Sequence, residues 1–346
     1  LDVKAVVIKQ FGGPENLVAA ELPDPKPGPG EVVVRVRACA LNHLDLFVRE
    51  GIPAYKIRLP HILGCDVAGE VVETGPGVAS AKTGDRVAVS PGRSCLRCEF
   101  CLDGKDNHCQ RYGIIGAQGG PGGYAELLTV PEAYLLPLPT GIGYDAGAAY
   151  PLTFLTAWHM LITLGQCGPG QWVLVLGAGS GVGVASIQTA KLAGARVIAV
   201  STSEEKLEKS RALGADETIL TPAQNLVKQT LKITGGRMAD IAVEHVGPAV
   251  FDAALKSLRC GGRLITCGAT TGPIIELDLR YVFSRQLKIL GSHMGSQAEM
   301  RRVAQLVGEG RLKSVIDRRF ELSEARAAHQ YLADKRQFGK VVLSLP

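Results

Sequence analysis

An apolar run followed at once by a glycine-rich turn is the feature that most restricts how this chain can fold. Residues 172–176 read Trp-Val-Leu-Val-Leu, residues 177–183 read Gly-Ala-Gly-Ser-Gly-Val-Gly, and a helical pattern runs from Gly181 to Leu192. Strand-like and helical segments continue to alternate between about residues 140 and 290. Strands that alternate with helices form parallel sheets, so this stretch is predicted to be α/β with a parallel sheet.

A glycine turn between a strand and a helix is typical of a dinucleotide-binding site. Its glycines allow a tight turn and a close approach of the backbone to a pyrophosphate, and the helix N-terminus offers free N–H groups to the anion. A flexible turn without a ligand is the alternative. We expect these residues to contact a dinucleotide coenzyme: Ala178, Gly179, Ser180, Gly181, Val182 and Gly183.

The end of the next strand, residues 196–200, indicates which dinucleotide binds. NAD sites usually place Asp or Glu there to bond the ribose hydroxyls, whereas this strand runs into Ser-Thr-Ser with a lysine soon after. Hydroxyls and a lysine favour NADPH, although Glu204 and Glu205 lie near enough to keep NADH as an alternative. The expected ligands of this part of the coenzyme are Ser201, Ser203 and Lys206.

Four cysteines are spaced closely in a loop rich in Gly, Arg and Asp. Zinc prefers soft thiolates at tetrahedral corners, and tightly spaced cysteines in short turns supply that geometry. A site closed by four protein ligands leaves no position for substrate or water, so the predicted zinc is structural, one per chain. Unliganded thiols and an iron–sulfur cluster are the alternatives. The predicted ligands are Cys95, Cys98, Cys101 and Cys109.

The first 130 residues have a different texture from the α/β stretch. Short apolar runs at 32–36, 67–72 and 85–89 are separated by glycines and prolines, which predicts β-strands joined by turns. The strand-like segment 340–345 at the other end of the chain is expected to pair back into this first domain. A chain of 346 residues, 46% of them hydrophobic, is long enough for two domains with full cores.

Charge and hydropathy exclude several classes of protein. The 38 basic and 33 acidic residues are interspersed, which argues against a nucleic-acid partner. No run approaches the roughly 18 apolar residues of a membrane helix, and the first residues lack the order of a signal peptide, so we expect a cytoplasmic protein without a membrane partner. Nine widely spread cysteines in such a chain indicate thiols or metal ligands rather than disulfides.

The order of these features resembles the medium-chain dehydrogenase/reductase superfamily over essentially the whole chain. The resemblance implies a GroES-like catalytic domain at 1–150 and 289–346, with a zinc lobe at about 92–112, and a Rossmann coenzyme domain at 151–288. It also implies a small-molecule substrate and a homodimer or homotetramer. The motifs that carry it, besides the cysteine lobe and the glycine turn, are 64–71 (Gly-Cys-Asp-Val-Ala-Gly-Glu-Val), 212–216 (Ala-Leu-Gly-Ala-Asp) and 338–343 (Phe-Gly-Lys-Val-Val-Leu).

Zinc-dependent alcohol dehydrogenases of this superfamily hold a catalytic zinc with a cysteine, a histidine and a second cysteine. By the resemblance, these positions fall on Asn42, Cys65 and Leu152, so none of the three matches, and Leu44 replaces the hydroxyl residue that relays protons. An amide binds zinc poorly and a leucine does not bind it, so we expect no catalytic zinc. A different metal site is left open as an alternative, from the residues His43, Cys65, Asp66 and His159.

Asn42 together with Asp45 instead resembles the quinone oxidoreductase branch, whose members use NADPH to reduce quinones or the activated C=C bond of enones. Most of that branch lacks the cysteine lobe, so the chain combines features of two branches. The resemblance and the chemistry of hydride transfer suggest Asn42 as a donor to the developing oxyanion or enolate and Tyr55 as a proton donor. The catalytic candidates are therefore Asn42, Asp45 and Tyr55.

The resemblance carries over further coenzyme contacts: His43, Thr156, Gly247, Gly268, Ala269 and Lys340. The function predicted is an NADPH-dependent oxidoreductase that transfers hydride to a quinone, enone or carbonyl substrate without a catalytic zinc. A zinc-type alcohol dehydrogenase and a non-catalytic NADPH-binding structural protein are the alternatives.

Overall fold

The chain forms two compact units in a computed structural model that describes residues 2–53 and 55–346. Unit 1 comprises Leu1–Leu152 and Ser296–Pro346, and unit 2 comprises Thr153–Gly295. The second boundary lies later in the chain than the expected one at residue 289. The reason is that β16 (Lys288–Gly291) pairs with a strand of the parallel sheet and so belongs to unit 2.

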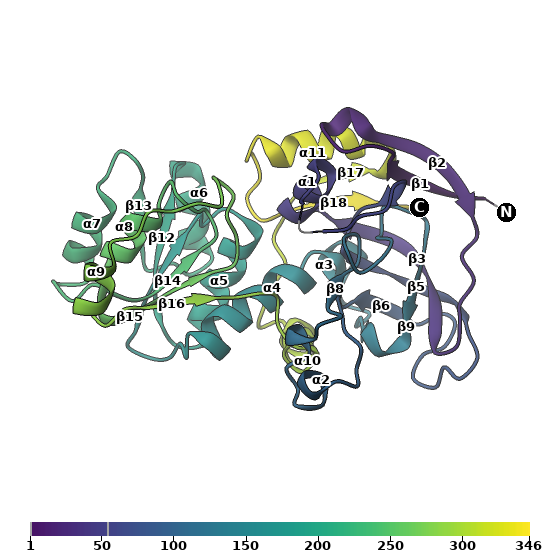
Figure 1. Cartoon of the computed structure of the whole chain (residues 1–346), viewed down its shortest axis with the longest axis horizontal. Coiled ribbons are helices and arrows are strands. Elements are labelled where there is room, and N and C mark those ends of the chain that lie inside the picture. Colours follow the sequence, from purple (N-terminus) through teal and green to yellow (C-terminus); the bar gives the residue numbers. More distant parts are fainter. Residues whose placement is uncertain (1, 54) are drawn as a thin grey trace. The chain divides into compact units, whose positions relative to one another are not determined.

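Unit 1 is built around a seven-stranded sheet in which β3 (Glu31–Ala40) pairs antiparallel with both β5 and β18 (Figure 1). The strand at residues 340–344 thus pairs with a strand from the first 130 residues, as the sequence suggested. In spatial order the path is β10 (Leu135–Pro137), β6 (Arg86–Val89), β5 (Asp66–Thr74), β3, β18 (Lys340–Ser344) and β17 (Ile316–Glu321), with β9 (Leu127–Pro131) also paired to β3.

Two smaller sheets and several helices complete unit 1. The first sheet consists of β2 (Leu17–Pro23), β1 (Asp2–Ile8) and β4 (His61–Ile62), and the second of β7 (Gly92–Arg93) and β8 (Gly113–Ile114). The helices are α1 (His43–Glu50), α2 (Glu99–Leu102), α3 (Tyr144–Ala148), α10 (Gln297–Gly308) and α11 (Ala325–Ala333). Helix α4 (Pro151–Trp158) runs across the boundary into unit 2.

Unit 2 contains one six-stranded sheet in which every pair of neighbours is parallel. Starting at β11, the strand order has the pattern 3-2-1-4-5-6 of a dinucleotide-binding sheet. The spatial order is β13 (Glu217–Leu220), β12 (Arg196–Ser201), β11 (Trp172–Leu176), β14 (Ala239–Glu244), β15 (Leu258–Thr266) and β16. The helices are α5 (Gly181–Leu192), α6 (Glu204–Ala212), α7 (Leu226–Ile233), α8 (Phe251–Lys256) and α9 (Leu279–Ser284).

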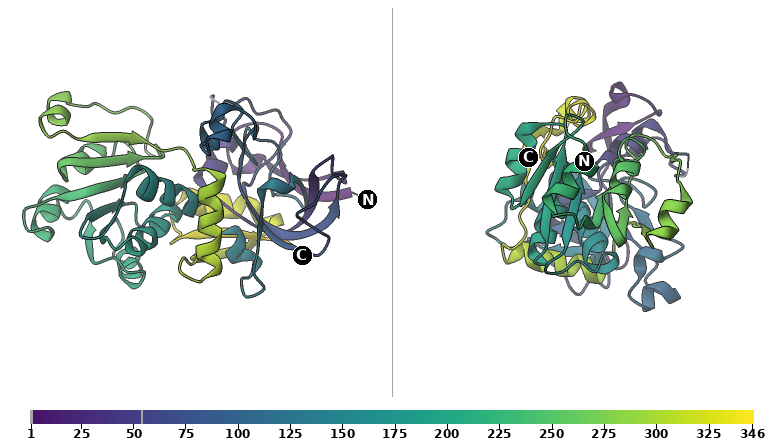
Figure 2. Two further views of the ribbon diagram at one scale, coloured as in Figure 1. Left: turned by 90° about the horizontal axis from the view of Figure 1, so that it is seen from below. Right: turned by 90° about the vertical axis from the view of Figure 1, so that its left-hand side faces the viewer.

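Helices cover both faces of this parallel sheet (Figure 2). Alternate residues of β11 belong to opposite cores: Val173 packs with Ile187 of α5, and Leu174 packs in the same core as Phe251 of α8. All five residues of β11 are buried, which explains why its sequence is apolar throughout rather than alternating. The predicted α/β class and the parallel coenzyme sheet are confirmed. No helix in the described part of the chain is both long and apolar enough to cross a bilayer.

A buried histidine ties two helices of unit 1 together. The Arg49 side chain on α1 donates to Nδ1 of His329 on α11 at 3.1 Å, and Nε2 of the same ring lies 2.9 Å from the Tyr124 hydroxyl. Since arginine can only donate, Nδ1 must accept, which requires the neutral ring. Burial lowers the pKa of His329 to about 3, and the neighbouring Arg49 charge acts in the same direction.

This histidine makes the stability of unit 1 dependent on pH. In the unfolded chain its pKa is about 6.5, so the stabilisation is complete above that pH and is lost as pH falls toward 3. We expect the free energy of unfolding to fall by about 1.4 kcal/mol for each pH unit below 6.5 from this residue alone. When unfolding by denaturant is measured between pH 7 and 5, the free energy of unfolding should depend less steeply on pH in H329Q than in the wild-type protein. Y124F, which keeps the titrating ring, should retain the wild-type slope, and equal slopes in all three proteins would contradict the assignment.

Candidate functional site

Three polar side chains meet in unit 1 because of how β3, β5 and β18 pair. Asn42 follows the end of β3, Asp66 opens β5 and Lys340 opens β18. Both neighbours run antiparallel to β3, so the first residues of β5 and β18 lie beside the last residues of β3, at the same end of the strands. Residues separated by 298 and 274 positions in the chain are thereby brought into contact.

The contacts among these side chains are hydrogen bonds between buried groups. Lys340 Nζ donates to Asn42 Oδ1 at 2.6 Å and to Asp66 Oδ2 at 2.9 Å. Asn42 Nδ2 donates to the same Asp66 oxygen at 2.8 Å, and it also lies 3.3 Å from the sulfur of Cys65. The Asn42 amide, expected as a donor to substrate, therefore has acceptors for its hydrogens inside the protein. Lys340, expected at the coenzyme, is bonded within this cluster.

Asp45 adds a second buried carboxylate close to Asn42. Its Oδ2 accepts the backbone N–H of Asn42 at 2.7 Å, and its Oδ1 accepts that of Gly64 at 3.0 Å. Burial raises the pKa of Asp45 to about 7 in spite of these bonds and of the Lys340 charge, which lower it. The side chain holds the start of α1 against the segment that leads into Cys65.

The three positions that correspond to catalytic zinc ligands carry Asn42, Cys65 and Leu152, and each of them makes hydrogen bonds within the protein. Burial raises the pKa of the Cys65 thiol well above its usual value, and the nearby Asp66 carboxylate acts in the same direction. Leu152 contributes its backbone N–H, which donates to Asp66 Oδ1 at 2.8 Å. In the described part of unit 1, the only group of three or more His, Cys, Asp or Glu ligand atoms within 4.8 Å of one another is the four-cysteine lobe.

The other catalytic candidate and two coenzyme candidates lie outside this cluster of bonds. Tyr55 is half-buried, and burial raises its pKa although a hydrogen bond with the side chain of Gln118 lowers it. Its neighbour Ala54 lies outside the described residues. His43 opens α1, with its ring 6.4 Å from that of Phe47, and Thr156 is buried in α4.

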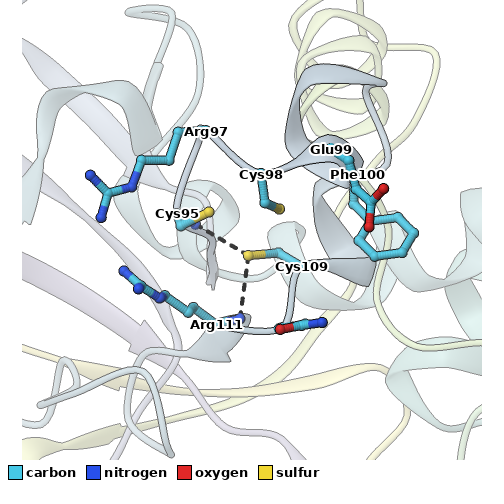
Figure 3. A pocket seen from close by; sticks show the side chains of 8 residues that line it. Cys95, Arg97, Cys98, Glu99, Phe100, Cys109 and Arg111 are labelled. Atoms are coloured by element: carbon cyan, nitrogen blue, oxygen red, sulfur yellow. Dashed lines mark hydrogen bonds between the residues drawn. The ribbon is translucent and has the colours of Figure 1, made fainter.

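The four predicted zinc ligands converge in a lobe of unit 1, and Figure 3 shows three of them, Cys95, Cys98 and Cys109. Cys98 and Cys101 have their sulfurs 3.5 Å apart, and those of Cys95 and Cys101 are 3.9 Å apart. Tetrahedral zinc with Zn–S bonds of about 2.3 Å requires sulfurs about 3.8 Å apart, so the lobe fits the ion. Leu96 supports this convergence, because its left-handed φ of 57° turns the chain between Cys95 and Cys98.

Backbone N–H groups point at the sulfurs of the lobe. Cys109 accepts from the N–H groups of Cys95 at 3.4 Å and of Arg111 at 3.3 Å, and Figure 3 marks both contacts. A hydrogen bond from the Arg97 N–H contributes most to lowering the pKa of Cys95 to about 6. Such donors favour the thiolate, which is the form that binds metal. The donor set is thus suited to a closed structural zinc.

The glycine turn of unit 2 has the geometry of a pyrophosphate site. The N–H of Gly183 donates to Ser180 Oγ at 2.9 Å, so Ser180 caps the N-terminus of α5. A side chain on Gly183 would come within 2.4 Å of the Gly177 carbonyl, so only glycine allows the helix to start this close to the turn. The first N–H groups of a helix have no carbonyl partner within it, and such groups can bind an anion.

The sequence analysis missed His245, which lies beside this turn. His245 Nε2 is 3.2 Å from Ser180 Oγ, and a Cβ on Gly177 would meet the same ring at 2.9 Å. Burial lowers the pKa of His245 to about 4, which favours the neutral ring. A usable signal was present: polar residues at the carboxyl end of a strand next to β11 lie at the coenzyme edge of a parallel sheet.

The carboxyl ends of β14 and β15 bring the other predicted glycines together. Glu244, fully buried and also missed, accepts the N–H groups of Val246 at 2.5 Å and Gly247 at 2.6 Å. A Cβ on Gly247 would lie 3.4 Å from Ala269, and one on Gly268 would lie 3.1 Å from the His245 carbonyl. The structure therefore places these coenzyme candidates side by side at one edge of the sheet.

At the end of β12 no carboxylate takes the position that favours NAD. Ser201 is buried and its Oγ accepts the N–H of Ser203, whose own Oγ caps α6. The stem of Lys206 lies against the glycine turn, since a Cβ on Gly179 would come within 2.7 Å of it. Glu204 and Glu205, which kept NADH as an alternative, form ion pairs with basic residues of α6. Glu205 lies 2.6 Å from Lys209, and Glu204 lies 3.6 Å from Arg211.

Comparison with known proteins establishes the family. Residues 28–140 match the alcohol dehydrogenase GroES-like domain, and residues 181–309 match the zinc-binding dehydrogenase domain. The chain belongs to the medium-chain dehydrogenase/reductase superfamily, among its zinc-type alcohol dehydrogenase-like proteins. This membership confirms the resemblance seen in the sequence and identifies unit 1 as the GroES-like part of the fold.

The relatives of this family member carry several activities in their names. An alcohol dehydrogenase of Geobacillus stearothermophilus is 34% identical, with 91% of this chain and 92% of the relative covered. A quinone oxidoreductase of Pseudomonas aeruginosa is 31% identical, with 98% and 99% covered, and an acryloyl-coenzyme A reductase of Sulfurisphaera tokodaii is 30% identical, with 99% of each covered. A crystal structure of an NAD-dependent alcohol dehydrogenase matches with a TM-score of 0.96 at 48% identity, covering 99% of this chain and all of the other.

We expect loss of one lobe cysteine to release the metal. In C101S the remaining three thiolates cannot close a tetrahedral site, so the zinc content should fall from one per chain to near zero, and the thermal midpoint should fall with it. Zinc can be counted by atomic emission on the purified proteins. C260S, which removes an exposed free cysteine of unit 2, serves as the matched control and should keep its zinc. A C101S protein that retains a full equivalent of zinc would contradict the assignment.

Proposed function

We propose that this protein transfers hydride from NADPH to a quinone, to the activated C=C bond of an enone or enoyl thioester, or to a carbonyl, without a catalytic zinc. As a member of its family, it is an NAD(P)-dependent oxidoreductase. The choice of acceptor, the coenzyme and the lack of a catalytic metal are the parts proposed.

The observation that carries the proposal is the bonding of Asn42. A catalytic zinc would need a ligand at this position, but the Asn42 oxygen is bound by the Lys340 ammonium at 2.6 Å. A positive charge is thus already present, and the carboxylate that balances it, Asp66, is bound to the same ammonium at 2.9 Å. A zinc ion beside an ammonium group would be repelled. This arrangement supports a reaction that needs no metal to stabilise the developing oxyanion.

The end of β12 supports NADPH as the coenzyme. Ser201, Ser203 and Lys206 lie at the end of β12 and the start of α6, where they could bind a 2′-phosphate, and the nearby glutamates are engaged with basic residues of α6. Lysine serves as a point charge for phosphate, and the serine hydroxyls can donate to it. The NAD-dependent alcohol dehydrogenase that is 48% identical keeps NADH as the alternative.

In the mechanism, NADPH supplies the hydride when it is bound. Residues of unit 2 would hold it: the α5 N-terminus would bind the pyrophosphate, and the contacts of Ser180 with His245 and Gly183 would keep the turn in place. In unit 1, Asn42, held by Lys340 and Asp66, is the candidate that would stabilise the oxyanion or enolate that forms on the acceptor. Tyr55 is the candidate that delivers the proton which must follow.

The relatives' names support two acceptor classes equally well. The quinone oxidoreductase and the acryloyl-coenzyme A reductase both act, by name, on electrophilic unsaturated compounds. Alcohol dehydrogenase is the second candidate function, favoured by the 34% and 48% identical relatives. That activity in this chain would proceed either with a rebuilt metal site or with the lysine cluster in place of the metal.

A combined metal and activity measurement tests the proposal. We expect one zinc per chain, and NADPH-dependent reduction of a quinone, an enone or an enoyl-coenzyme A thioester, followed as loss of absorbance at the nicotinamide band. Two zinc ions per chain, with alcohol oxidation as the main activity, would instead establish the alcohol dehydrogenase. Tight NADPH binding without turnover of any acceptor or alcohol would indicate a non-catalytic protein.

The coenzyme arm of this experiment uses K206A. Loss of the lysine should lower kcat/KM for NADPH by roughly tenfold, because a charged contact to phosphate contributes about 1.4 kcal/mol or more, and should leave kcat/KM for NADH nearly unchanged. K228A, at an exposed lysine of α7, serves as the control. An equal effect of K206A on both coenzymes would argue against a 2′-phosphate contact.

A homo-oligomer is part of the proposal. Strand β16 forms one edge of the unit 2 sheet, and large apolar side chains near it are exposed: Leu279 (66%) and Phe283 (70%) on α9, and Ile274 (78%) before it. Exposed apolar groups beside an unpaired edge strand favour pairing with another chain.

Light scattering should therefore give about twice the 36.6 kDa of one chain, or a higher multiple. F283E should shift the protein toward the mass of one chain, because it places a charge in the apolar patch. L102E, at an exposed leucine of the zinc lobe, should not shift it. A wild-type mass of 36.6 kDa would exclude the oligomer.

A further inference from the structure

The most unusual buried group in unit 1 is the ammonium of Lys340. Its side chain is 4% exposed and that of its partner Asp66 is 0% exposed. Removing both charges from water is unfavourable, and an apolar pair of similar volume commonly stabilises a fold at least as well. Stability alone therefore does not explain why the fold keeps this buried lysine–aspartate pair. The pair is better explained if the site needs its charges, or the orientation that they impose on a neighbouring group.

We propose that Lys340 is a positioning residue for hydride transfer: with Asp66, it fixes the orientation of the Asn42 carboxamide at the place where metal-dependent relatives bind their zinc. The inference rests on the function proposed above and goes beyond it by assigning the lysine to the reacting end of the site. It departs from the coenzyme contact that the sequence suggested for this residue.

The chemistry of the three groups allows only one orientation of the amide. An ammonium group has donors only, and an ionised carboxylate has acceptors only. With Oδ1 toward Lys340 and Nδ2 toward Asp66, both bonds are satisfied, at 2.6 and 2.8 Å. Rotating the amide by half a turn would set a donor against the ammonium and an acceptor against the carboxylate. Lys340 and Asp66 together therefore select one of the two states of Asn42.

The same two side chains connect the amide to the surrounding backbone. Lys340 begins β18, and its backbone N–H is bonded to the Val315 carbonyl at 2.9 Å. Asp66 accepts the backbone N–H of Leu152 through its other oxygen at 2.8 Å. The orientation of Asn42 is thus fixed by elements from both ends of unit 1.

A positioning lysine and a coenzyme-binding lysine predict different kinetics. Loss of a coenzyme contact raises the Kd of NADPH. Loss of a group that orients Asn42 leaves that Kd unchanged and lowers kcat, because the interaction matters for the reacting groups only. Removal of residues that orient reactive ligands typically costs 10–100-fold in activity.

The experiment compares K340M with the wild-type protein. We expect a 10–100-fold lower kcat and an NADPH Kd within twofold of wild type, measured by nicotinamide fluorescence without acceptor. Because K340M leaves Asp66 unpaired, D66N/K340M removes both charges. The double variant should recover thermal stability but not kcat. K82M, at an exposed lysine of unit 1, should match wild type in every measurement.

A double-mutant cycle with Asn42 decides whether the lysine acts through the amide. If it does, K340M should lower kcat strongly in the wild-type background and less than threefold in N42A. Additive effects of the two substitutions on kcat would overturn the proposal. A tenfold or larger rise in the NADPH Kd of K340M would also overturn it and restore the coenzyme role.

The failure of this inference can be distinguished from failure of the proposed function. If the wild-type protein oxidises alcohols instead of reducing the acceptors, the reductase proposal fails, and the same cycle is measured with NADP⁺ and alcohol. If the wild-type protein turns over neither acceptors nor alcohols, two measurements test the contact between Asn42 and Lys340: the NADPH Kd of K340M, and the additivity of the effects of N42A and K340M on thermal stability. An unchanged NADPH Kd, together with non-additive effects of N42A and K340M on the thermal midpoint, supports a fixed Asn42–Lys340 contact. Additive effects of the two substitutions on the thermal midpoint exclude it.

Discussion

The antiparallel pairing of β3 with both β5 and β18 is the constraint on which the rest of unit 1 depends. Its register sets Ala40 opposite Asp66 on one side and opposite Val342 on the other. The residues that follow or precede these pairs are then held at one edge of the sheet. Asn42 and Lys340 are brought together by that register and not by any local sequence pattern. Shifting one strand by a residue would send its polar side chain to the opposite face of the sheet.

The elements that the sequence predicted well are those governed by local pattern. The strand at 172–176 and the helix from Gly181 to Leu192 match β11 and α5 to the residue, since an apolar run, a glycine turn and a capping serine all lie within 21 positions. The four cysteines were found for the same reason, because they span only 15 residues and carry a spacing that zinc requires.

What the sequence could not show depends on contacts between distant parts of the chain. His329 meets Arg49 across 280 positions, and Lys340 meets Asn42 across 298. Each of these side chains, taken alone, has an ordinary alternative explanation as a surface or coenzyme residue. His245 was missed for a different reason: its position after β14 gains meaning only when β14 is known to lie beside β11. The catalytic roles of Asn42, Asp45 and Tyr55 stay predictions.

The pairing of the last strand also has a consequence for the order in which the chain folds during synthesis. Unit 2 is one uninterrupted segment, Thr153–Gly295, and all the strands of its sheet are available once that segment has left the ribosome. Unit 1 is completed later, because residues 38–40 at the end of β3 lack their partner strand until residues 340–344 emerge. Unit 1 is therefore completed only by residues that follow unit 2 in the chain, and until these emerge the short free edge of β3 is open to pairing with other chains.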